Sequence, residues 1–421
     1  MILNNIVSFF RKNTYIFPLI VCLTIGATYF CLSQLITGDI FTPTKYNYYI
    51  YLLDAFFHGH INVTPPYHYD LSIYQNKWYM VWGPSPVLFI LPFYILFHLN
   101  ASDVMYTAIG GTINVALFYA FIQEFKKYFM LSISLFENIF ILLNFGLASP
   151  NLFLSVASQI WFTSQIFATT YLLLFYLFYF QFLNREKYYQ LILCVIFFCL
   201  ACLSRSSLLF NGILFIYLFI HYKNLGRAIS AKIIWFPALL TLAFASLGAL
   251  YNYLKFHNIL ETGERFVIGA SRYAPINKNA PILSIQYVLR NMYYCFLNTV
   301  HFSSVHQLIF LDPDGNSVFL VYPVLLLLPA LFCIRKYIDK KRLLFLIIAG
   351  TVIVLNISLV MLYFATGWQQ FGYRYFFDVI PLLFLLPIFI LQYIPFSIQM
   401  VLLTWGIVVN FCGVIGFYTI R

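Results

Sequence analysis

Apolar runs of about 20 residues recur along the whole of this 421-residue chain, and they constrain its fold more than any other feature. A helix of that length crosses the hydrocarbon core of a bilayer and satisfies its own backbone hydrogen bonds there. Only 9% of the residues are charged, against about 25% in soluble domains. Soluble single-core, disordered, collagen-like and disulfide-scaffold folds are therefore excluded. The sequence predicts an all-α polytopic membrane protein that forms one domain over residues 1–421.

We predict about eleven membrane-spanning helices. They cover residues 15–36, 103–123, 129–147, 162–183, 187–204, 206–221, 233–254, 317–334, 342–363, 376–393 and 396–418. A further apolar run, 82–99, contains Pro84, Pro86 and Pro92, which weaken a regular helix. We expect this run to be a juxtamembrane or re-entrant helix that does not cross.

The net charge of +11 is concentrated in short clusters between the apolar runs. The clusters are Arg11/Lys12, Lys126/Lys127, Arg185/Lys187, Lys223/Arg227/Lys232 and Arg335/Lys336/Lys340/Lys341/Arg342. If run 82–99 does not cross, all of them lie on the side of the N-terminus, which the positive-inside rule makes cytoplasmic. Nucleic acid is therefore not an expected partner, and any chemistry is expected outside the cytoplasm. The long polar segments 37–102 and 255–316 are the predicted extracytoplasmic loops.

The first of these loops carries two carboxylates, Asp54 and Asp70, with aromatic residues between them. A carboxylate at a membrane surface can act as a general base toward a hydroxyl while aromatic rings bind a sugar face. Both residues could equally be solvated loop acids. The histidines of the loop do not favour a metal site, because a third ligand would have to come from a distant segment.

A second polar group lies in the segment 367–381, GWQQFGYRYFFDVIP. Its Arg374 is flanked by Tyr373 and Tyr375, and Asp378 follows four residues later, so an Arg374–Asp378 pair is expected if the segment is α-helical. A guanidinium at the membrane surface can bind a lipid phosphate through two charge-assisted hydrogen bonds. The alternative is an interfacial anchor, since Tyr, Trp and Arg are common at membrane boundaries.

Arg205, in CLSRSSLLF, lies between two apolar runs with no other charge near it. An ionisable residue at that depth is a functional candidate by default, and we expect Arg205 to contact phosphate or substrate. Three other features have simpler interpretations. The segment 252–266 begins a polar loop, the segment 311–317 (LDPDGNS) is a turn that lacks the distal glutamate of a calcium loop, and Glu137 inside a predicted span has no evident role.

Four stretches together resemble the GT-C superfamily of polyprenyl-phosphate-dependent membrane glycosyltransferases. The resemblance is to the family-39-like proteins related to protein O-mannosyltransferases and aminoarabinose transferases. The stretches are DLSIYQNKWYMVWGPSPVLFILPF, LSRSS, NYLKFHNILETG and FGYRYFFD. The resemblance implies a GT-C-like bundle whose first outer loop holds juxtamembrane helices and a catalytic aspartate. Asp70 is the expected base because it lies in the stretch most like the family, and Asp54 is the alternative.

The predicted function is an inverting transfer of a sugar from a polyprenyl-phosphate donor to a glycan, lipid or protein acceptor outside the cytoplasm. Arg374 and Arg205 are expected to bind the donor phosphate. Supporting roles are predicted for Tyr373, Tyr375, Asp378, Glu261, Lys77 and Trp78. These residues require no metal or other cofactor, although an ion between the phosphate and Asp54 is compatible with them. The composition is typical of an AT-rich bacterial genome, so the expected location is a bacterial cytoplasmic membrane.

Two alternatives belong to other classes. A transporter or flippase of a lipid-linked or amphipathic solute would contain inverted repeats, broken helices and charges near the midplane. The sequence gives no sign of repeats or broken helices. An inactive GT-C-like scaffold is the other alternative.

Overall fold

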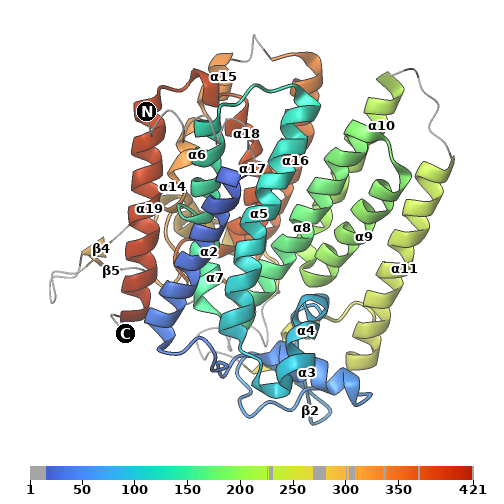
Figure 1. The fold of residues 1–421 in the computed structure, drawn as a ribbon. Helices are drawn as coiled ribbons and strands as arrows, with labels where there is room; N and C mark the ends of the chain where they lie inside the picture. The colour runs from blue at the N-terminus through green and yellow to red at the C-terminus, as the bar shows by residue number, and fades with distance from the viewer. Residues whose placement is uncertain are drawn as a thin grey trace.

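A computed structural model of the chain describes residues 16–224, 226, 231–268, 281–299, 301–302, 309–310, 312–334, 338–367 and 370–419. Long helices run roughly side by side and make up most of the molecule (Figure 1). They are α2 (Ile16–Thr37), α5 (Asp103–Phe129), α8 (Ile160–Arg185), α9 (Tyr188–Ser204), α11 (Ala231–Phe256), α16 (Lys340–Leu362) and α19 (Phe396–Thr419). The all-α polytopic membrane class is confirmed.

In the described part of the chain, seven helices are long and apolar enough to cross a membrane. One of them joins the 3-10 helix η2 (Ser206–Ile213) to α10 (Leu214–Asn224). The count becomes eight if α6 (Leu135–Gly146) and α7 (Pro150–Ala157), which meet at a 45° bend, form one span. The predicted number of eleven is therefore not established, and α9, with 17 residues, falls just below the length of a span.

Two predicted spans, 317–334 and 376–393, are interrupted, so the expectation of unbroken helices there was wrong. The first contains α14 (Val318–Val321), η6 (Pro323–Leu327) and α15 (Ala330–Ile334). The second contains η8 (Arg374–Val379), α17 (Ile380–Leu383), α18 (Leu385–Ile388) and η9 (Leu391–Tyr393). Each run holds two prolines, which remove backbone donors and clash with the preceding turn.

Helix α8 lies at the centre of the bundle, and nearly all of its residues are buried. Polar side chains join it to α5: Thr107 and Thr163 hydroxyls lie 2.8 Å apart, and the Thr170 hydroxyl donates to Asn114 over 2.7 Å. In a membrane, where apolar helices gain little by leaving lipid, small polar contacts of this kind help to fix helix pairing.

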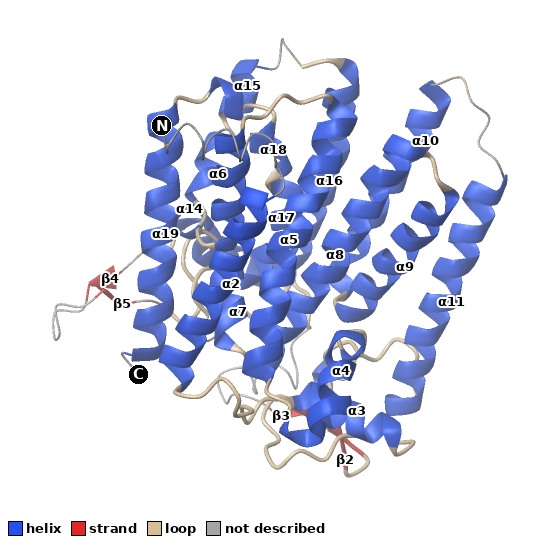
Figure 2. Ribbon diagram, viewed as in Figure 1, coloured by secondary structure: helices blue, strands red, loops and turns tan. Residues whose placement is uncertain are grey.

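The segment 37–102, predicted to be the first outer loop and called so below, folds into α3 (Tyr48–Phe57), β1 (Leu71–Tyr74), β2 (Lys77–Tyr79) and α4 (Val87–Phe97), which gather at one end of the bundle (Figures 1 and 2). Helix α4 has 11 residues, and its length of about 16 Å is too short for a hydrocarbon core of about 30 Å. It packs on α3 and continues into the short η1 (His98–Asn100). This agrees with the prediction that run 82–99 does not cross.

A small antiparallel sheet connects the two long polar segments. Its strand order is β2-β1-β3, where β3 is Val267–Ile268, and Ser72 is opposite Val267. The Ser72 hydroxyl also donates to the carbonyl of Gly263 over 2.7 Å. We call this end of the bundle, with α3, α4 and the sheet, the loop end.

Other elements of the second polar segment are short. They are η3 (Glu264–Phe266), η4 (Ile285–Tyr287), α13 (Val288–Met292), the π-helical η5 (Tyr293–Leu297), β4 (His301–Phe302) and β5 (Ile309–Phe310). At the end of the segment, the Gly315 amide donates to the Asp312 carbonyl over 3.0 Å, which confirms the predicted turn in LDPDGNS.

Basic clusters meet at the opposite end, which we call the basic end. Lys341 and Arg342 donate to the carbonyls of Tyr128 and Phe129, and Arg185 pairs with Glu124. The start of α16 and the end of α10 lie at this end, across the bundle from α3 and α4 (Figure 1). Of the predicted clusters, Arg11, Lys12, Arg227, Arg335 and Lys336 lie outside the described residues.

Glu137 caps the start of helix α6. Its carboxylate accepts from the backbone amide of Ser134 over 2.7 Å, and the Ser134 hydroxyl accepts from the Glu137 amide. This capping box satisfies backbone donors at the helix start, so Glu137 has a structural role that its S-x-x-E spacing could have indicated.

Candidate functional site

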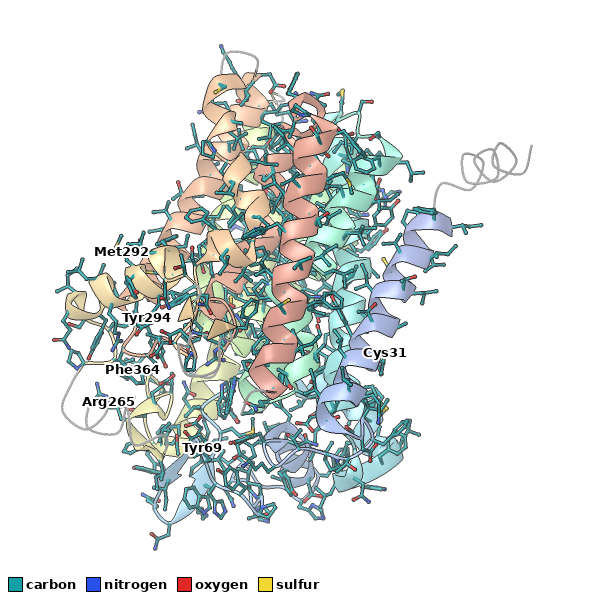
Figure 3. The ribbon with its side chains drawn as sticks, turned by 90° about the vertical axis from the view of Figure 1, so that its left-hand side faces the viewer. Cys31, Tyr69, Arg265, Met292, Tyr294 and Phe364 are labelled. Atoms are coloured by element: carbon teal, nitrogen blue, oxygen red, sulfur yellow. The ribbon has the colours of Figure 1, made fainter. Side chains whose placement is uncertain are left out.

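A cavity of ≈ 500 Å³ opens at the loop end of the bundle. Its walls come from the first outer loop, the α9–η2 junction, the last turns of α11 and α16, and the segment around η8. Figure 3 shows the side chains of this region, with Tyr69, Arg265 and Phe364 labelled near it. The polar side chains that matter below are Arg205, Lys255, Glu264, Tyr363, Arg374 and Tyr375.

Gly83 allows the first outer loop to close on the end of α9. A Cβ at this position would lie 1.7 Å from the carbonyl oxygen of Leu203, so no other residue fits without moving backbone. Ser85 strengthens the contact, because its hydroxyl donates to the carbonyl of Leu200 over 2.8 Å. The stretch VWGP, residues 81–84, therefore forms one wall of the cavity beside Arg205.

Arg205 is held by Asp378. Its Nη2 and Nε lie 2.9 and 3.0 Å from the Asp378 carboxylate, whose side chain is 2% exposed. Ser207 and Gln165 donate to the same carboxylate over 2.8 and 2.9 Å. Asp378 is thus fully engaged, and it orients Arg205 at the cavity wall.

The expected pair between Arg374 and Asp378 does not form in the described structure. Residues 374–379 form the 3-10 helix η8 in place of an α-helix. With three residues per turn, positions i and i+4 no longer face the same side. The carboxylate of Asp378 consequently faces Arg205, 173 residues away in the sequence.

Arg374 is 6% exposed and has no ion pair with a carboxylate among the described residues. Its Nη2 donates to the Gly367 carbonyl over 2.8 Å and approaches the Tyr375 hydroxyl at 3.4 Å, while its Nε lacks a partner. The guanidinium lies 4.8 Å from the centre of the Tyr375 ring, which also faces Arg205 at 5.7 Å. A buried cation without a counterion is costly, so this arrangement favours an anionic ligand.

Glu264 is the carboxylate that lines the cavity. Tyr363 donates to it over 2.8 Å. Burial raises the pKa of the Glu264 carboxyl, and the hydrogen bond from Tyr363 and the charge of Arg205 oppose that shift. Glu264 stands in the polar segment 252–266, where nothing in the local spacing indicates that it meets Tyr363.

Asp70 is half-buried at the start of β1, next to the cavity but not among the residues that line it. Its backbone is left-handed, with φ 60°, and its amide donates to the carbonyl of Ile268 over 3.0 Å. Burial raises the pKa of Asp70 to about 6; the charge of Arg374 lowers it and that of Glu264 raises it further. Asp70 therefore interacts electrostatically with two groups of the cavity.

Asp54, the alternative base, lies on α3 and interacts elsewhere. The Tyr94 hydroxyl donates to it over 2.8 Å, and His58 approaches it at 3.7 Å. The carboxylate side chain is 32% exposed and does not line the cavity. The structure thus separates the two candidate aspartates, and of the two only Asp70 interacts electrostatically with the buried Arg374.

The remaining predicted supporting residues fall into two groups. Tyr375 and Asp378 contact the arginines of the cavity, as described above. The other four do not line the cavity. Lys77 is exposed in the β1–β2 hairpin, and Trp78 stacks on His68 with 4.3 Å between the ring centres. Glu261 accepts a hydrogen bond from the Gly263 amide, and Tyr373 is buried. Within the described part of the chain, no group of three or more His, Cys, Asp or Glu side chains could hold a metal ion.

Among solved structures, the fold is similar to that of archaeal oligosaccharyltransferase AglB from Archaeoglobus fulgidus. The complex of that protein with an inhibitory peptide and a dolichol-phosphate matches 96% of this chain and 56% of its own, with 13% identity and a TM-score of 0.52. The apo form of the oligosaccharyltransferase from the same organism matches 94% of this chain and 56% of its own, with 12% identity and a TM-score of 0.53.

ArnT from Cupriavidus metallidurans, bound to undecaprenyl phosphate, matches 90% of this chain and 62% of its own, with 13% identity and a TM-score of 0.47. This chain therefore spans less than two thirds of the length of these proteins. No protein-family model and no curated protein sequence matches it. At 12–13% identity the likeness establishes the fold alone, an architecture that this chain shares with the oligosaccharyltransferase.

Proposed function

We propose that this protein is a membrane glycosyltransferase that moves a sugar from a polyprenyl-phosphate donor to an acceptor outside the cytoplasm. The observation that supports it most is Arg374, a buried guanidinium without a carboxylate partner among the described residues, in a cavity at the loop end. An archaeal oligosaccharyltransferase with a similar fold has been solved with a dolichol-phosphate bound. A phosphate is the ligand that best matches both facts, because a guanidinium binds its oxygens two at a time.

In the proposed reaction, Arg374 and Arg205 bind the phosphate of the donor. Asp70 accepts the proton of the acceptor hydroxyl as its oxygen attacks the anomeric carbon. The bond between that carbon and the phosphate oxygen breaks with inversion, and the lipid phosphate leaves with the electron pair. The guanidinium groups stabilise the negative charge that develops on the departing phosphate.

Asp70 suits the role of base because its raised pKa brings it closer to neutral pH while leaving it ionised there. Glu264 is the competing candidate, since it lines the cavity directly. The hydrogen bond from Tyr363 occupies one of its oxygens. We therefore retain Asp70 as base and use Glu264 as the comparison in the experiments below.

Transport of a lipid-linked solute is the second candidate, and the interrupted helices at 317–334 and 374–393 favour it, because transporters build midplane sites from broken helices. Both functions would use the arginines. Only transfer requires a proton acceptor beside them.

Purified protein in sealed liposomes separates the two. Radiolabelled polyprenyl-phosphate sugars are supplied with candidate glycan, lipid and protein acceptors, and the label is followed by extraction and chromatography. Covalent transfer of label that requires Asp70 supports the proposal. Movement of intact donor across the bilayer without covalent transfer, unchanged in the Asp70→Asn variant, contradicts it and supports transport.

A further inference from the structure

Lys255 is a third cation in the cavity, and the proposed phosphate site does not use it. It lies in the last turn of α11, is 2% exposed and lines the same cavity as Arg374. Its ammonium donates to the carbonyl of Met80 over 3.2 Å and lies 4.3 Å from the centre of the Tyr251 ring. In the sequence, Lys255 belongs to the segment 252–266, whose local pattern indicates only the start of a polar loop.

The environment of Lys255 leaves much of its charge uncompensated. An ammonium has three donors, and the described residues provide one acceptor, the Met80 carbonyl. Lys255 forms no ion pair with a described carboxylate. The aromatic faces of Tyr251 and Phe256, at 4.3 and 4.9 Å, supply only part of the missing stabilisation. Burying a lysine ammonium in this way costs free energy unless a ligand supplies the missing hydrogen-bond acceptors and negative charge.

Lys255 is structurally independent of the arginines. Arg205 and Arg374 share the Tyr375 ring and belong to the α9–η2 junction and η8, whereas Lys255 is fixed by α11 and by the first outer loop at Met80. The cavity therefore has two separate positive centres. The carboxylate of Asp378 compensates Arg205, and Glu264 accepts a hydrogen bond from Tyr363. Glu261 acts on Lys255 through its charge but accepts from the Gly263 amide, and none of the three carboxylates forms an ion pair with Lys255 in the described structure.

We infer that Lys255 binds a second anionic group of the donor headgroup, while Arg374 binds the phosphate attached to the sugar or lipid. This inference rests on the proposed function and makes Lys255 a determinant of donor specificity. Two chemistries supply such a group: the second phosphate of a lipid diphosphate, and the carboxylate of an acidic sugar on a lipid monophosphate. A cavity of ≈ 500 Å³ is within the usual range for a site that encloses a ligand of this kind.

Four non-transferable probes test it by direct binding to the purified full-length protein in nanodiscs. They are polyprenyl monophosphate, polyprenyl diphosphate, and phosphonate analogues of polyprenyl-phospho-glucose and polyprenyl-phospho-glucuronic acid. Lys255→Met removes the charge but keeps the length and apolar stem, so it preserves packing against Tyr251. Lys127→Met, at the exposed end of α5, removes the same charge at the basic end and serves as the matched control.

Wild-type protein is expected to bind one probe with two anionic groups more tightly than its counterpart with a single anionic group. Lys255→Met should lower the affinity for that probe by about 10- to 100-fold, because one hydrogen bond to a charged group is lost. The affinity for the counterpart should change by less than about twofold. Lys255→Arg should restore part of the preference. A selective loss of affinity for the diphosphate identifies a second phosphate as the group that Lys255 binds. A selective loss of affinity for the glucuronic acid analogue identifies the carboxylate of an acidic sugar.

Equal binding of all probes by wild-type protein would overturn the inference. So would a Lys255→Met effect of the same size on every probe, since a merely structural lysine would act in that way. In either case the proposed function stands as long as Arg374→Ala weakens every probe. A protein that binds none of the probes contradicts both.

Discussion

The two ends of the bundle use the same cationic residues in different ways. At the basic end, Arg185 is 41% exposed and pairs with Glu124, and Lys341 donates to the carbonyl of Tyr128. At the loop end, Arg374 and Lys255 are 6% and 2% exposed, face a cavity, and have no carboxylate partner among the described residues. A hydrated cation at a membrane boundary serves as an anchor, whereas a buried, uncompensated one indicates a ligand. Burial thus distinguishes the cations of the proposed site from those of the basic end.

The most severe loss of activity is expected at the loop end, from Asp70→Asn. The variant keeps the shape of the side chain but removes the proton acceptor, so transfer should fall by about 10²- to 10⁴-fold while donor binding persists. Initial rates with radiolabelled donor measure transfer, and direct binding of a non-transferable analogue measures donor affinity.

Asp54→Asn and Glu264→Gln are the matched controls for that experiment. Both should retain far more activity than Asp70→Asn. If Asp54→Asn or Glu264→Gln lost activity while Asp70→Asn kept it, the base would be reassigned to that residue. Full activity in all three variants would rule out a general-base mechanism that uses any of these carboxylates.

The buried pair of Arg205 and Asp378 should matter most for stability. Asp378→Ala removes a carboxylate that is 2% exposed and leaves Arg205, which is 14% exposed, uncompensated, so we expect a loss of about 3 to 5 kcal/mol in the free energy of unfolding. Chemical unfolding in detergent measures it. The double variant Arg205→Met/Asp378→Leu should recover part of the loss, because it removes both charges. A stability unchanged by Asp378→Ala would show that the pair is not buried in solution.

Transfer should depend on the ionisation of Asp70. The folded-state pKa is about 6, above the ordinary value for aspartate, so the carboxyl is a competent base above that pH and is protonated below it. The value of kcat/KM should therefore fall about tenfold per pH unit below about pH 6 and level off above it. A profile that stays flat from pH 5 to 8 would rule out Asp70 as the group that titrates.

Substitutions at the basic end should change stability and donor binding least. Glu124→Ala breaks an ion pair whose arginine is 41% exposed and removes the acceptor of a hydrogen bond from Asn184, so the free energy of unfolding should fall by about 1 to 2 kcal/mol. Donor binding should not change. If this variant destabilised the protein as much as Asp378→Ala, the contrast drawn between the two ends would be wrong.

Much of the fold follows from local patterns in the sequence. Apolar runs of sufficient length indicate the main helices, and the prolines of run 82–99 together with the placement of basic residues indicate that it does not cross. Arg205 stands out because it is a lone charge between apolar runs, and the structure puts it at the cavity wall. These features depend on composition within a single segment, which the sequence displays directly.

The site depends on contacts between distant segments, and local spacing misled the prediction there. Asp378 follows Arg374 by four residues, which suggests a pair on an α-helix, but residues 374–379 form the 3-10 helix η8 and Asp378 meets Arg205. Lys255 and Glu264 reach the cavity because α11 ends beside Met80 and β3 pairs with β1. No spacing rule encodes such packing, so neither residue could be chosen from its neighbours in the sequence.

Direct binding of a non-transferable polyprenyl-phosphate analogue to Arg374 variants tests the central claim. Arg374→Ala should weaken binding by about 2 to 5 kcal/mol, and Arg374→Lys should lose much of the affinity because an ammonium cannot bind phosphate oxygens in pairs. Arg185→Ala, at the basic end, should bind as well as the wild type. An unchanged affinity in well-folded Arg374→Ala would reduce Arg374 to an interfacial anchor and leave Arg205 as the remaining candidate for the phosphate.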